Sequence, residues 1–99
     1  MSHTRQQHIT QAADALSATT SHPAGGSSEH ELLVAVSDLA SIAELVAQLI
    51  KYYRYELAEW ATVTAHLQQA HGDAHDLARS LKHACGTLAF NTALQPAAA

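Results

Sequence analysis

Residues 29–71 decide the fold, and they read EHELLVAVSDLASIAELVAQLIKYYRYELAEWATVTAHLQQAH. This stretch contains neither Gly nor Pro, the two residues least compatible with a helix interior. Ser28 and Glu31 have the spacing of a capping box at its start, and Gly72 stands after its end as a natural C-cap. The stretch therefore predicts one continuous helix over 29–71, ~64 Å long.

Apolar side chains recur every seven residues along this stretch, and a second row follows four residues behind the first. This spacing is typical of helices that pack along a heptad seam. The flanking positions are mostly Ala, Leu and Ile rather than charged, which favours a bundle of three or four helices over a two-stranded coiled coil. The residues that we expect to drive self-association are Leu32, Leu39, Val46, Ile50, Tyr53, Leu57, Trp60 and Leu67.

Shorter helical signals lie on both sides of the long stretch. Thr4 and Gln7 suggest a capping box for an amphipathic helix within 1–20, and Pro23 with Gly25-Gly26 marks a flexible linker over 21–28. A last helix is expected over about 74–90, which gives a bundle core of 29–92 and a tail of 93–99.

The prediction is an all-α protein with a long central helix, about 29–71. The shorter N- and C-terminal helices pack back on it, and the bundle is completed by dimerisation. Two short helices cannot cover a wide apolar face of this length, so a second copy is expected to cover the rest. The alternative is a break near Lys51–Glu56 that gives a compact four-helix bundle.

Composition excludes several classes of function. The 99 residues carry 9 acidic and 5 basic side chains, a formal net charge of -4, which argues against binding to nucleic acid or an anionic membrane surface. We find no apolar run long enough for a transmembrane helix and no apolar leader segment, so no membrane association is expected. The single Cys85 cannot form an intrachain disulfide, and the expected location is the cytoplasm.

An aromatic pair lies on the predicted outer face of the long helix. Tyr52 and Tyr55 are three residues apart, and Glu59 follows on the same side. Tyrosine combines apolar area with a polar tip, as interface anchors often do, so these three residues are the predicted partner-binding site. Alternatively, the tyrosines cover the junction where a neighbouring helix ends.

The sequence holds 8 histidines, and four of them are the candidates for metal ligation: His66, His71, His75 and His83. Three or four ligands must converge to hold zinc, and Gly72-Asp73 interrupts the expected helix between His71 and His75. No metal and no cofactor are therefore predicted. If every histidine were protonated, the net charge would move from -4 to +4, which suggests pH-sensitive association.

No catalytic constellation is apparent, so the predicted function is non-enzymatic. We expect a self-associating helical bundle that acts as an adaptor, regulator or assembly subunit, with a second copy and another protein as partners. The alternative is a bundle that binds a small ligand or a metal ion. Trp60 is followed by Ala61-Thr62 within an expected helix, which departs from the Trp-x-Gly turn of small secreted helical hairpins, and the chain is not assigned to that family.

Overall fold

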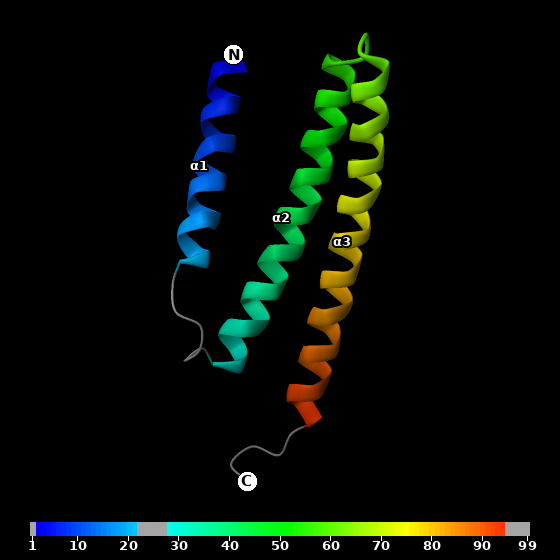
Figure 1. Cartoon of the computed structure of the whole chain (residues 1–99). Helices are drawn as coiled ribbons and strands as arrows, with labels where there is room; N and C mark the ends of the chain where they lie inside the picture. Colours follow the sequence, from blue (N-terminus) through cyan, green and yellow to red (C-terminus); the bar gives the residue numbers. More distant parts are fainter. Residues whose placement is uncertain (1, 22–27, 95–99) are drawn as a thin grey trace.

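The computed structural model describes residues 2–21 and 28–94, which form three helices: α1 (Ser2–Thr20), α2 (Glu29–Glu56) and α3 (Ala61–Leu94) (Figure 1). The described residues contain no strand, so the prediction of an all-α protein is confirmed. Most of the predicted linker and tail, residues 22–27 and 95–99, lies outside the described residues.

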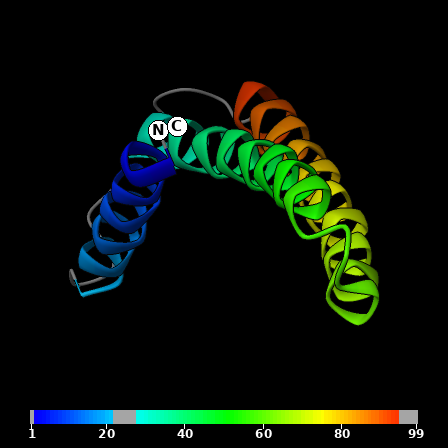
Figure 2. The same ribbon diagram turned by 90° about the horizontal axis from the view of Figure 1, so that it is seen from above.

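In Figure 1 the helices run down, up and down in an open arrangement. α2 lies in the middle, with α3 beside it on one side and α1 on the other, and the end-on view shows an arc rather than a closed bundle (Figure 2). The helices whose backbones approach closely are α2 and α3. The radius of gyration is 17.3 Å, against ~13 Å for a compact domain of this length. The described residues therefore form an elongated hairpin of α2 and α3, to which α1 is loosely attached.

The long central helix packed against the other helices is present, but its predicted end at His71 is wrong. α2 ends at Glu56, and residues 57–60 make a turn. In this turn the Leu57 amide donates to the Tyr53 carbonyl at 2.9 Å, and the Trp60 amide donates to the Leu57 carbonyl at 3.0 Å. The alternative prediction placed a break near Lys51–Glu56, and the turn follows directly after those residues. The described residues nevertheless form three helices rather than the four of that alternative.

The C-terminal helix also differs from the prediction. It is the longest of the three at 34 residues, it begins at Ala61 rather than near 74, and it continues through Gly72 without a cap. Trp60 consequently lies at the end of the interhelical turn instead of inside a helix. Because the turn contains no Gly or Pro, tertiary packing and not local propensity decides where the chain reverses.

That packing is an alanine seam. The buried side chains among the described residues are Ala40, Ala43 and Ala47 of α2 and Ala74 and Ala78 of α3, and no large side chain is fully buried. One straight helix would keep these two groups of alanines far apart. The hairpin brings them together, and small side chains let the two helices approach closely.

The two predicted helix starts have different outcomes. Ser28 is the N-cap of α2, and its hydroxyl accepts a hydrogen bond from the Glu31 amide at 3.1 Å, as the capping box predicts. α1 begins at Ser2, so Thr4 lies inside the helix and the capping box predicted there is wrong.

Gly72 offers a direct test of the uninterrupted α3. A Cβ added at Gly72 would have no neighbouring atom within 4 Å, so Gly72→Ala should raise the free energy of unfolding by roughly 0.5–1 kcal/mol through helix propensity. Thermal unfolding would measure it. Gly86→Ala, equally unobstructed, is the matched control and should act in the same direction. A loss of stability in Gly72→Ala alone would instead place Gly72 at a helix end in the left-handed conformation.

Candidate interaction surface

α2 carries two apolar faces, and α3 covers one of them. The face that contacts α3 contains the buried alanines, whereas the second face carries larger side chains toward α1. Between α1 and α2 lies a groove of about 720 Å³. Its apolar lining consists of Ile9, Ala12, Ala13 and Leu16 from α1 and Ile42, Leu45, Val46 and Leu49 from α2. We call this feature the α1–α2 groove.

The groove is open to solvent. Leu45 is 56% exposed, and Ile9, Leu16, Val46 and Leu49 are also exposed. Most apolar side chains of this size are buried in folded proteins, and a continuous row of exposed ones marks an interaction surface. Two helices that meet this loosely therefore leave a surface suited to a further apolar partner.

One polar cluster attaches α1 to α2. The Arg5 guanidinium lies 3.9 Å from the centre of the Tyr52 ring and donates a hydrogen bond of 3.3 Å to the Glu56 carboxylate. The Tyr53 side chain, followed by those of Tyr52 and Glu56, raises the pKa of Arg5 above its ordinary value. Arginine is a cation at physiological pH, so the Arg5 guanidinium can hold the ring and the carboxylate together.

Loss of this cluster should detach α1. In Arg5→Ala we expect faster amide hydrogen exchange throughout α1 and unchanged exchange in the seam residues of α2 and α3, because no close backbone packing holds α1 in place. Arg79→Ala is the control, since Arg79 pairs with Asp76 on its own helix. Equal exchange rates in wild type and Arg5→Ala would mean that the apolar lining holds α1 without the cluster.

The predicted self-association residues lie on α2, in the interhelical turn and on α3. None is fully buried within the chain. The structure leaves Leu32, Leu39, Val46 and Trp60 exposed and makes Ile50, Tyr53, Leu57 and Leu67 half-buried. The alanines Ala40 and Ala47, one position after the first heptad row, take the buried centre of the seam instead. The role of the eight predicted residues in self-association stays a prediction.

The predicted partner-binding residues have different surroundings. Tyr52 is covered in part by Arg5, and its ring meets that of Tyr53 edge-on at 6.1 Å. Tyr55 is 74% exposed, and Glu59 lies in the interhelical turn beside Trp60, which is 58% exposed. Tyr52 therefore helps to hold α1, whereas Tyr55 is exposed, and the partner-binding role of Tyr52, Tyr55 and Glu59 stays a prediction.

The four histidines considered for metal ligation all lie on α3. Among the described residues, no group of three or more His, Cys, Asp or Glu side chains lies close enough to hold a metal ion. His71 and His75, however, form a pair whose ring centres are 5.0 Å apart. Sequence reasoning missed this pair because it ended a helix at Gly72, although the i, i+4 spacing was present.

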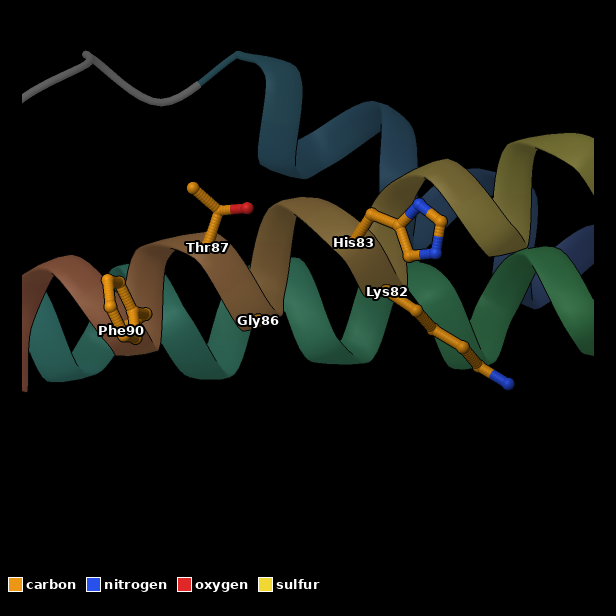
Figure 3. A pocket seen from close by; sticks show the side chains of 5 residues that line it. All are labelled: Lys82, His83, Gly86, Thr87 and Phe90. Carbon is orange, nitrogen blue, oxygen red and sulfur yellow. The ribbon is translucent and has the colours of Figure 1, made fainter.

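A second hollow lies along the C-terminal half of α3. Figure 3 shows its lining of Lys82, His83, Gly86, Thr87 and Phe90, and its volume is about 490 Å³. These five residues all belong to one helix, so no opposing side chains converge on a ligand. The α1–α2 groove, which is lined from two helices, is the better candidate.

By length and composition alone, α2 could cross a membrane. A mostly buried core helix of a soluble protein and a signal sequence meet the same criterion, and the apolar window of α2 is 17% buried in this structure. The expectation of no membrane association stays a prediction.

Comparison of the chain with protein-family models, curated proteins and solved structures found no match. The surface between α1 and α2 is therefore the basis of the function proposed below.

Proposed function

We propose that this chain is a non-enzymatic helical protein that self-associates through the α1–α2 groove and acts as an adaptor, regulator or assembly subunit. The observation that supports this proposal is the imbalance between core and surface. The buried side chains among the described residues are alanines, while most of the large aliphatic side chains of α1 and α2 are exposed. A small domain with so little buried area needs further apolar contacts, and a second copy supplies them.

The size of the surface can be compared with that of a dimer interface. α1 has 19 residues and is ~28 Å long, and two helices side by side are ~20 Å wide, so their shared face measures roughly 570 Å², against ~800 Å² per partner in a standard interface. A second copy can bury its own groove against this one in a two-fold arrangement, in which both copies use the same residues.

The charge of the groove is compatible with this occupant. Each copy carries a net charge of -4, so two copies repel one another at long range. The groove lining contains Arg5 and His8 but no carboxylate, so the repelling acids lie outside the apolar contact. Salt screening should therefore strengthen the association.

Sedimentation equilibrium over a concentration series tests the proposal. We expect a dimer at micromolar concentration and above, with tighter association at high salt. A monomer at every concentration and salt would contradict self-association. The exposed groove would then be available to a different protein, which is the other partner that we propose for this chain. We propose the cytoplasm as the location of both.

A further inference from the structure

From the geometry of α3 we infer a metal-binding site: His71 and His75 form a two-histidine chelate for a divalent transition-metal ion such as Zn²⁺. The two residues stand four apart on one uninterrupted helix, so their side chains lie one above the other on the same face. Their rings are already in contact, with centres 5.0 Å apart and planes at 77°.

The separation of the rings matches what a shared ion requires. Zinc binds imidazole nitrogen at ~2.0–2.1 Å with tetrahedral angles, which places the centres of two ligating rings about 5 Å apart. Neutral imidazole is a preferred ligand for zinc, copper and nickel. The pair can therefore chelate an ion through small side-chain rotations, without a change in the backbone.

The surroundings leave room for an ion and for water. His71 and His75 line a hollow of about 280 Å³ together with Glu44, Gln48 and Lys51 of α2. Glu44 is engaged in an ion pair with Lys82 of α3, so it is not free to act as a third ligand. We therefore assign two protein ligands and water at the remaining positions, an exchangeable site rather than a structural one.

This site is independent of the proposed self-association, because it lies on the seam between α2 and α3 and not in the α1–α2 groove. The helical turn of α3 between the two histidines contains Gly72, a residue of low helix propensity. An ion that bridges His71 and His75 spans this turn, so metal binding should stabilise α3.

Zinc titration of the full chain, followed by calorimetry and by the imidazole NMR signals, tests the site. We expect one Zn²⁺ per chain at His71 and His75, and a higher unfolding temperature with zinc. His71→Ala and His75→Ala should each weaken zinc binding at least about tenfold, because a chelate becomes a single ligand. Both variants should keep the helicity of the zinc-free wild type.

His66→Ala and His83→Ala are the matched controls, since both remove an exposed histidine of α3 that has no ring partner at this spacing. They should leave the zinc affinity unchanged. Equal affinity in wild type and His71→Ala would overturn the assignment. One Zn²⁺ per two chains would also overturn it, because the ion would then be shared between copies.

Discussion

Replacement of Leu45 and Leu49 by Glu is expected to convert the proposed dimer into a folded monomer. Both side chains line the α1–α2 groove and are exposed in the single chain. Each one should contribute ~1 kcal/mol when a second copy covers it, about half the value for full burial of a leucine. Four such side chains per dimer give ~4 kcal/mol, which is about a thousandfold weaker association.

Glutamate is chosen because it preserves helix propensity, so the variant should keep its α2 helicity. The readouts are the mass from sedimentation equilibrium and the helicity from circular dichroism, both at one concentration. A monomer with unchanged helicity places the groove in the dimer interface. A monomer with lost helicity would mean that the hairpin folds only as it associates.

The control variant is Phe90→Glu. Phe90 is 64% exposed, more than Leu45, but it lines the separate hollow on α3. If association depended only on general surface hydrophobicity, the double variant and Phe90→Glu would weaken it equally. We expect a dimer in Phe90→Glu. A dimer in the double variant and a monomer in Phe90→Glu would move the interface from the groove to α3.

The sequence predicts the helical class well because periodicity and capping are local signals. Ser28 caps α2 as its spacing with Glu31 suggests. The reversal at 57–60 could not be predicted in this way, because Leu57, Ala58 and Glu59 are all compatible with a helix. What determines the turn is a match between alanines far apart in the chain, a non-local property that tertiary packing supplies.

The same limit applies to the candidate sites. The heptad pattern identified which side chains are apolar, but it did not distinguish the face that meets α3 from the face that meets α1. Ala40 and Ala47 occupy the seam, whereas Leu39 and Val46, one residue earlier, are exposed. Likewise, His71 and His75 form a pair because α3 continues through Gly72, which the sequence pattern did not predict.

The second large effect is expected at the seam itself, from Ala43→Leu. Ala43 is 4% exposed where α2 meets α3, so three further carbon atoms must force the two helices apart. Overpacking of this kind costs ~1–3 kcal/mol. At about 2 kcal/mol the unfolding temperature of a domain this small should fall by roughly 8–16 °C.

Ala65→Leu is the matched control because it makes the same chemical change at an exposed position of α3. It should leave the unfolding temperature within a few degrees of wild type, since Ala and Leu have similar helix propensities. Thermal unfolding must be compared at one protein concentration, because dimerisation raises the apparent stability as concentration increases. If Ala43→Leu were instead stabilising, the helices would be separated widely enough to hold larger side chains. The alanines would then leave unfilled space between the helices. They would not explain why the hairpin closes where it does.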